Sequence, residues 1–359
     1  MVKNIVHVVG ARPNFVKCAP VIKGISGLMG DDVKQILIHT GQHYDKNLSD
    51  IFFNSLGMPK PDINLKIGSS KLHGAQVAEV IIGIEKFLLN KNIDLLLVYG
   101  DVNSTLGAAI AAVKLGIKIA HVEAGLRSFD TTMPEEINRM IVDRISNYHF
   151  VTENSAVKNL LNEGLDKSSI FLVGNTMIDS LYNILQTIPE QEGEKEEYVL
   201  LTLHRPSNVD NIDGLKKIIR ICEKIDAKMY FPMHPRTKNN FGKFKLLEKL
   251  ESIEKLELLQ PVGHFEFVSL MKNSMLVITD SGGVQEETTA LSIPCLTLRK
   301  NTERPSTITD GTNRLVDTSA DIARYIAAMR ASNYVDYLKP KLWDGFSGER
   351  IARIIKEVI

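Results

Sequence analysis

Carboxylate and imidazole side chains follow apolar runs of this sequence at positions that suit acid–base chemistry. Asp101 follows the run LLLVYG, Glu123 ends the run IKIAHVE, and His204 ends the run YVLLTLH. A carboxylate that is desolvated and held close to a carbon atom can remove a weakly acidic proton from it and return that proton later. These residue types therefore predict proton transfer at carbon as the chemistry of the candidate site.

Two strand-to-helix turns are suited to binding an anion such as a diphosphate. In GARPNFVK (10–17), Arg12 and Lys17 are expected near the positive end of a helix. In ITDSGGVQEE (278–287), the backbone N–H groups after Ser281 open another helix, whose first turn is expected to hold Glu286 and Glu287. A carboxylate there could accept both hydroxyls of a ribose. Neither turn is GxGxxG or a Walker A loop, so neither dinucleotide binding nor P-loop chemistry is predicted.

Short apolar runs alternate with segments of helical spacing, which predicts parallel sheets covered by helices. The pattern is interrupted once, by the acidic stretch TIPEQEGEKEE (187–197), and then resumes. We therefore expect an α/β fold of two doubly wound domains that face each other across a ligand-binding cleft. The expected strands lie at residues 4–10, 35–41, 94–101, 117–123, 148–152, 169–174, 198–204, 229–234, 256–262, 274–280 and 294–299.

The composition narrows the classes of partner. Lys plus Arg equals Asp plus Glu at 43 each, so bulk charge predicts binding to neither nucleic acid nor an anionic membrane surface. Three scattered cysteines without CxxC spacing predict a reducing compartment rather than disulfides or a zinc site. No apolar stretch approaches the roughly 20 residues that span a bilayer. We expect a cytoplasmic protein without a signal peptide.

Several motifs together resemble the non-hydrolysing UDP-N-acetylglucosamine 2-epimerase family. They are GARPNFVKCAPV, HTGQHYD, VYGDVNST, HVEAGLRS, PEEINR, TLHRPSNVDN, DSGGVQEE and NTERPSTITDGTNRLV, in family order over residues 4 to 355. The resemblance implies two Rossmann-like domains of the glycosyltransferase-B type with an interdomain active-site cleft. It also implies C2 epimerisation of a UDP-sugar by anti elimination of UDP to a 2-acetamidoglucal and re-addition, without a metal or nicotinamide cofactor.

The resemblance assigns roles residue by residue. The catalytic carboxylates match Asp101, Glu123 and Glu135, and the active-site histidine matches His204. The UDP-binding positions match Arg12, Lys17, Ser281, Gly282, Gly283 and Glu287, together with a loop near Phe267 at the uracil ring. Further candidates for the pocket are Gln42, His43, Arg127, Arg139, Arg205 and His234.

The family resemblance also predicts the organisation of the chain. Residues 1–180 are expected to form the N-terminal Rossmann-like domain, residues 181–338 the UDP-binding domain, and residues 339–359 a helix that packs back on the N-terminal domain. A homodimer is expected, because members of the family are commonly dimers.

Departures from the family pattern leave the sugar open. The common bacterial motif His-Arg-Arg-Glu-Asn is HRPSN (204–208) here, and SSKLHGAQ (69–76) lacks the Arg-Gln pair of a second, activating substrate site. These changes resemble a sister branch that acts on UDP-2,3-diacetamido-2,3-dideoxyglucuronic acid. A hydrolysing epimerase, a glycosyltransferase on the same scaffold and a nucleotide-sugar-binding module remain as alternatives.

Overall fold

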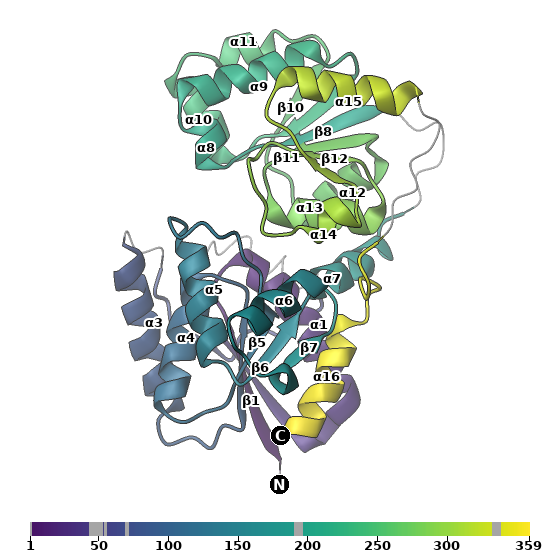
Figure 1. Ribbon diagram of the computed structural model, residues 1–359. Helices are drawn as coiled ribbons and strands as arrows, with labels where there is room; N and C mark the ends of the chain where they lie inside the picture. Colours follow the sequence, from purple (N-terminus) through teal and green to yellow (C-terminus); the bar gives the residue numbers. More distant parts are fainter. Residues whose placement is uncertain (1, 43–52, 54–55, 69–71, 190–196, 332–338) are drawn as a thin grey trace. The chain divides into compact units, whose positions relative to one another are not determined.

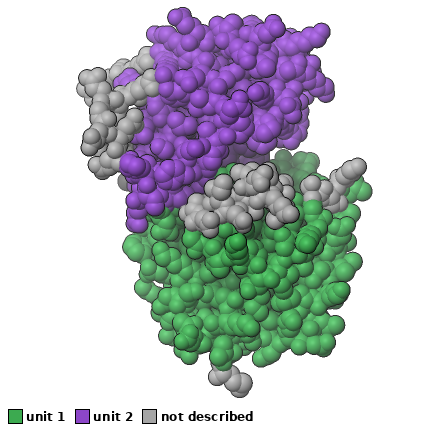
Figure 2. All heavy atoms as spheres, turned by 180° about the vertical axis from the view of Figure 1, so that it is seen from behind, with its two compact units in different colours: residues 1–183, 341–359 green, residues 184–340 purple. Residues whose placement is uncertain are grey.

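The chain divides into two compact units, each built on its own sheet. A computed structural model describes residues 2–42, 53, 56–68, 72–189, 197–331 and 339–359. The first unit comprises Met1–Asn183 and Lys341–Ile359, and the second comprises Ile184–Pro340 (Figure 2). The two units are described separately below.

The sheet of the first unit has seven parallel strands in the order β3-β2-β1-β4-β5-β6-β7. Strands β1, β5, β6 and β7 of this sheet are labelled in Figure 1. Every apolar run predicted in this half is a strand, as expected for segments buried on both faces. The two-residue β3 was not predicted, because it is too short to show a pattern. The strands are β1 (Lys3–Val9), β2 (Val33–His39), β3 (Ile63–Asn64), β4 (Leu95–Tyr99), β5 (Ile119–Ala124), β6 (Tyr148–Val151) and β7 (Ile170–Leu172).

Helices cover both faces of this sheet, and alternate residues of each strand pack into different cores. In β4, Leu95, Leu97 and Tyr99 face the core that α1 and α16 complete, whereas Leu96 and Val98 face the core of α3 and α4. The helices of the unit are α1 (Arg12–Met29), α3 (His73–Leu88), α4 (Asn103–Lys114), α5 (Pro134–Ile145), α6 (Asn154–Asn162), α7 (Thr176–Leu185) and α16 (Ser347–Val358), with 3-10 turns at Gly30–Asp32 and Lys167–Ser169.

The second unit repeats this architecture with six parallel strands in the order β10-β9-β8-β11-β12-β13. The strands are β8 (Tyr198–Thr202), β9 (Lys228–Pro232), β10 (Leu256–Leu259), β11 (Leu276–Thr279), β12 (Cys295–Thr297) and β13 (Asn313–Leu315), of which only β13 was not predicted. The helices are α8 (Pro206–Val209), α9 (Ile212–Lys224), α10 (Pro235–Lys243), α11 (Leu247–Glu251), α12 (His264–Asn273), α13 (Gly282–Leu291), α14 (Ser306–Thr309) and α15 (Ser319–Ala331).

The last helix, α16, belongs to the first unit and packs closely on α1. A Cβ at Gly348 would lie 2.3 Å from the carbonyl oxygen of Pro20, so only glycine permits this approach. Asp179 of α7 fixes the start of α16, because its Oδ2 accepts a hydrogen bond of 2.7 Å from the Gly348 N–H. Burial raises the pKa of the Asp179 carboxyl to about 6, despite hydrogen bonds from Gly348 and Ser347 that favour the carboxylate.

This raised pKa predicts a stability that depends on pH. Because the folded state holds the Asp179 proton more tightly than the unfolded state, the contribution of this one group to stability is greatest below about pH 4 and falls as the pH rises through about 6. The loss corresponds to roughly 3 kcal/mol for two pKa units. Asp179→Asn should therefore gain stability relative to the wild type between pH 4 and 7. Chemical unfolding followed by fluorescence of Trp343, the single tryptophan, measures this, and parallel pH curves would contradict it.

Candidate active site

The first cluster of functional side chains lies at the carboxyl ends of β4 and β5, which are neighbours in the sheet. Asp101 comes two residues after the end of β4, and Glu123 is the last residue but one of β5. The pairing of β5 with β6 shifts register between Val122 and Ala124, and Glu123 has a φ of +71°. A residue with a side chain adopts this left-handed conformation only where its surroundings impose it, and such strain is common at functional sites.

Glu123 forms a buried ion pair with Lys17 of α1. The Lys17 Nζ lies 2.7 Å from Glu123 Oε1, and the two side chains are only 5% and 3% exposed. Gly100 makes room for this pair, since a Cβ there would lie 2.8 Å from Lys17 Nζ. In this structure Lys17 is therefore the partner of a candidate catalytic carboxylate. The phosphate contact predicted for Lys17 stays a prediction.

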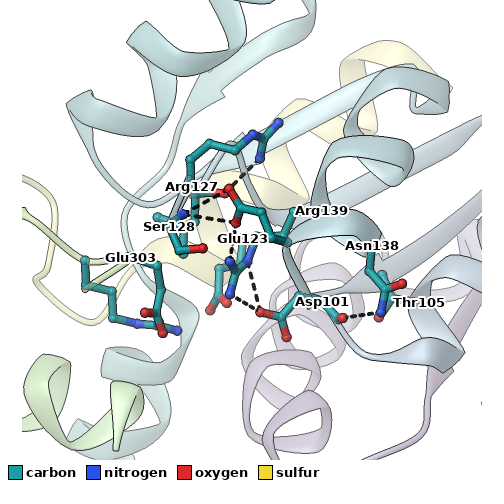
Figure 3. A network of polar contacts seen from close by, with 12 residues as sticks. Asp101, Thr105, Glu123, Arg127, Ser128, Asn138, Arg139 and Glu303 are labelled. Carbon is teal, nitrogen blue, oxygen red and sulfur yellow. Dashed lines mark hydrogen bonds and ion pairs between the residues drawn. The ribbon is translucent and has the colours of Figure 1, made fainter. Parts of the chain in front are cut away.

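Asp101 is held by Arg139 of α5 (Figure 3). Asp101 Oδ2 accepts hydrogen bonds from Nη2 and Nε of Arg139, at 2.6 and 3.0 Å. The backbone carbonyl of Asp101 accepts a further bond of 2.7 Å from Asn138 Nδ2. Arg139, predicted as a pocket residue, therefore fixes the position of a candidate catalytic group.

The two glutamates of the Pro-Glu-Glu run have different surroundings. Glu136 is buried, pairs with Arg139 at 2.6 Å, and accepts hydrogen bonds from the backbone N–H groups of Ser128 and Phe129. Burial would raise the pKa of Glu136, but these hydrogen bonds and Arg139 outweigh it and lower the pKa. Glu135 is half-buried, and its side chain has no hydrogen bond or ion pair with the described residues. Glu135 is thus the one of the two that can meet a ligand.

Other predicted residues of this unit have mixed surroundings. Arg127 is buried between Asp143 and Glu163, each 2.7 Å away. In this structure its guanidinium therefore binds protein carboxylates, which is a structural role, and is not exposed to a ligand. Gln42 accepts hydrogen bonds from the backbone and hydroxyl of Ser104 through its side-chain oxygen. Arg12 is exposed at the first residue of α1. His43 lies outside the described residues.

The second cluster, in the other unit, centres on the buried Asp280. Its carboxylate accepts hydrogen bonds from the backbone N–H groups of His204 and Arg205 and from Asn208 Nδ2. The His204 ring has its Nδ1 3.5 Å from Asp280 Oδ1 and is tilted by 32° against the His234 ring, with 5.5 Å between ring centroids. Burial, followed by the nearby His204, lowers the pKa of His234. The turn after β8 therefore presents an imidazole that is oriented by a carboxylate.

The turn before α13 is present, with two corrections to the prediction. Helix α13 begins at Gly282 after Ser281, so Glu286 and Glu287 lie in its second turn and not in its first. Glu286 instead pairs with Arg304 at 2.9 Å, and Glu287 lies 3.7 Å from His264 Nε2. The second correction is Phe267, which belongs to α12 and not to a loop.

A cluster of arginines lies beside this turn. Arg205, Arg299 and Arg304 surround Glu303, at 3.9, 2.9 and 2.6 Å. Their combined charge lowers the pKa of Glu303 far below its usual range although burial opposes this, and burial together with Arg299 lowers the pKa of Arg205. A Cβ at Gly282 would lie 2.9 Å from both Glu303 and Arg304, so only glycine fits there. The N–H groups at the start of α13 and these cations suit an anionic ligand.

Comparisons with known proteins decide the family. The family described as UDP-N-acetylglucosamine 2-epimerase matches residues 28–356. A UDP-N-acetylglucosamine 2-epimerase of Methanocaldococcus jannaschii is 43% identical over 97% of both chains. The chain belongs to the UDP-N-acetylglucosamine 2-epimerase family. The resemblance seen in the sequence is thereby confirmed.

Two further relatives place this UDP-N-acetylglucosamine 2-epimerase family member more closely. The crystal structure of the M. jannaschii UDP-GlcNAc 2-epimerase in complex with UDP-GlcNAc and UDP is similar with a TM-score of 0.88, at 43% identity and 99% coverage of both chains. The predicted α/β fold with two Rossmann-like sheets of the glycosyltransferase-B type is thus confirmed. A UDP-2,3-diacetamido-2,3-dideoxy-D-glucuronate 2-epimerase of Pseudomonas aeruginosa is 40% identical over 89% of this chain and 90% of its own.

Two features are absent from the described part of this family member. No group of three or more His, Cys, Asp or Glu side chains in that part could hold a metal ion. No helix in the described ranges is long and apolar enough to cross a membrane.

The buried Lys17–Glu123 pair predicts a specific pattern of stabilities. Lys17→Met should lower the free energy of unfolding by about 3–5 kcal/mol, because a buried carboxylate then loses its cation. Adding Glu123→Gln should restore part of this loss, because the buried charge is removed as well. Denaturant titration followed by Trp343 fluorescence measures both variants. Additive losses in the double variant would show that the two side chains do not interact.

Proposed function

We propose that this protein interconverts UDP-N-acetylglucosamine and UDP-N-acetylmannosamine by C2 epimerisation without hydrolysis. The observation that supports it most is that Asp101 and Glu123 lie at the carboxyl ends of the neighbouring strands β4 and β5, each bound to a cation. Glu135, at the start of α5, has no hydrogen bond or ion pair with the described residues. Relatives named as UDP-GlcNAc 2-epimerases match nearly the whole chain.

The proposed reaction has two halves. In the first, a carboxylate removes the C2 proton, the C–H electrons form a C1=C2 double bond, and the C1–O bond breaks with its electrons going to UDP. In the second, UDP adds back to C1 of the 2-acetamidoglucal, and a proton is returned to C2 on the opposite face. Each carboxylate must act in a dry site, where proton transfer to or from carbon is fastest.

The second unit is proposed to bind UDP. The start of α13 at Ser281, Gly282 and Gly283 would bind the diphosphate, and Glu287 the ribose. Phe267 would lie near the uracil ring, and Arg12 is a further candidate for a phosphate contact. His204, oriented by Asp280, would stabilise the charge that develops on the leaving UDP. No metal or nicotinamide cofactor is required by this scheme.

A second substrate is favoured by one comparison. The relative that acts on UDP-2,3-diacetamido-2,3-dideoxy-D-glucuronate is 40% identical to this chain. The HRPSN sequence at 204–208 also departs from the common bacterial pattern. C2 epimerisation of that uronate is therefore the alternative, with the same carboxylates in the same roles.

Proton NMR in D2O tests the proposal directly. UDP-N-acetylglucosamine incubated with the protein should give UDP-N-acetylmannosamine that carries deuterium at C2. Deuterated product from the diacetamido uronate alone would support the alternative substrate. Release of free sugar would indicate a hydrolysing epimerase, transfer only with an added acceptor a glycosyltransferase, and no reaction a binding module; each of these three results would contradict the proposal.

The same assay tests the assigned residues. Asp101→Asn, Glu123→Gln, Glu135→Gln and His204→Ala should each lower kcat by at least about 10²-fold, since an acid–base group is lost. Arg12→Ala and Glu287→Ala should weaken UDP binding more than they lower kcat. Glu85→Gln, an exposed carboxylate of α3, is the control and should leave kcat unchanged. Wild-type turnover in the Asp101 or Glu123 variant would contradict the roles given to them.

We also propose that the protein is a cytoplasmic homodimer. Helix α5 exposes Ile137, Met140 and Ile141, which are spaced to form one apolar face and are 45%, 45% and 39% exposed.

Met140→Glu should shift the protein from dimer to monomer, because a charge at the centre of an apolar interface is costly. Analytical ultracentrifugation measures this, and a wild-type monomer would contradict the proposal.

A further inference from the structure

Two buried titratable residues are bonded to the turns that carry the candidate carboxylates. Neither has a role in the proposed reaction. His121 of β5 comes two residues before Glu123, and Asp143 belongs to α5. Both side chains are completely buried. Fully buried charged groups are rare unless they are paired, and each one calls for an explanation.

Hydrogen bonds hold both side chains in place. His121 Nδ1 lies 2.6 Å from Asp143 Oδ1, and His121 Nε2 lies 2.8 Å from the carbonyl oxygen of Gly100. Both ring nitrogens of His121 are therefore held, one by a carboxyl group and the other by the backbone. Burial would raise the pKa of Asp143, but His121 and Arg127 outweigh it and lower the pKa, which keeps this group a carboxylate.

This pair links the two turns that carry the candidate catalytic groups. The Gly100 carbonyl, bonded to His121, belongs to the residue immediately before Asp101. The Gly125 N–H, which donates to Asp143 Oδ2 at 3.0 Å, lies two residues after Glu123. Gly100 and Gly125 have φ values of +62° and +79°, so both turns need external contacts to fix them.

Arg127 completes the arrangement from the other side of Asp143. Its Nη1 lies 2.7 Å from Asp143 Oδ2 and donates to the carbonyl of Leu126 at 2.8 Å. Its Nε and Nη2 bind the two oxygens of Glu163 at 2.7 Å. Asp143 is thus held between His121 and Arg127, and it cannot move without breaking contacts to both.

We propose that His121 and Asp143 are positioning residues for epimerisation, which set the separation of the Asp101 and Glu123 carboxylates by bonding to both of their turns. The inference rests on the proposed function. The two residues do not touch the substrate. They act through the backbone at Gly100 and Gly125, where a displacement of about 1 Å at the carboxylates is enough to cost about 10²-fold in rate.

Variants of Asp143 separate geometry from charge. Asp143→Ala removes the contacts to His121, Gly125 and Arg127, and should lower kcat by about 10²-fold. Its KM and its Kd for UDP should stay within about threefold of wild type, because the UDP-binding groups are untouched. Asp143→Asn can keep every contact, with the amide nitrogen donating to a neutral His121 ring and the amide oxygen accepting from Gly125. It should therefore restore kcat to within about tenfold of wild type.

A matched control and a second variant guard against a general loss of structure. Asp94 accepts a backbone N–H at 2.8 Å, from Asn4, but at the opposite end of β4. Asp94→Ala should therefore leave kcat and KM unchanged. If Asp143→Ala does not fold, His121→Gln serves in its place, because it keeps only one of the two donors and should lose kcat in the same way. The folded fraction of each variant is counted by calorimetric titration with UDP.

The outcomes distinguish this inference from the proposed function. A wild-type protein without epimerase activity would overturn both. An active wild type with undiminished kcat in Asp143→Ala or His121→Gln would overturn the inference alone. Equal losses of kcat in Asp143→Ala and Asp94→Ala would show a purely structural role and overturn the inference as well. A loss of activity that a smaller folded fraction fully accounts for would do the same.

Discussion

Negative charge held inside a protein needs a positive partner, and this requirement shapes the carboxyl edge of the first sheet. Glu123 is matched by Lys17 and Asp101 by Arg139, each within hydrogen-bond distance. The same contacts hold the carboxylates in place before any ligand arrives. A base that is already oriented needs little reorganisation when the reaction begins.

The parallel sheet makes this arrangement possible because it brings the ends of β4 and β5 to one edge. The elements around it then supply one partner each: α1 gives Lys17, α5 gives Arg139, and the turn at Gly100 leaves the space that the lysine needs. In the second unit, charged side chains also lie next to the ends of parallel strands. Three arginines surround Glu303 beside the start of α13, and Asp280 lies 3.5 Å from the His204 ring.

Much of the fold could be predicted from the sequence because strands buried on both faces are continuous apolar runs. The same logic predicted that Asp101 and Glu123 lie at one sheet edge. The short β3 and β13 were missed because two or three residues show no periodicity. His121 and Asp143 were missed for a different reason: their importance lies in hydrogen bonds between β5 and α5, which no local pattern contains. A polar residue inside the apolar run IKIAHVE was the one available signal, since a buried histidine must find partners.

The choice of partner for Lys17 was also beyond the sequence. A lysine in the first turns of a helix after a strand suits a phosphate as well as a carboxylate, and only the fold shows that Glu123 is within reach. Glu135 and Glu136 are adjacent and chemically alike, and the helix alone decides which one turns inward. Sequence patterns therefore indicated a candidate site, whereas the partners of individual charges followed from tertiary contacts.

The central proposal is that the carboxylates of Asp101, Glu123 and Glu135 act on C2 of a UDP-sugar, with Glu123 held by Lys17. A crystal structure of the protein with UDP-N-acetylglucosamine bound tests it most directly. The account predicts that C2 lies within about 3.5 Å of a carboxylate oxygen of Asp101, Glu123 or Glu135, while Lys17 still binds Glu123. A sugar bound away from these three residues, with Lys17 released from Glu123 to contact the diphosphate, would contradict it.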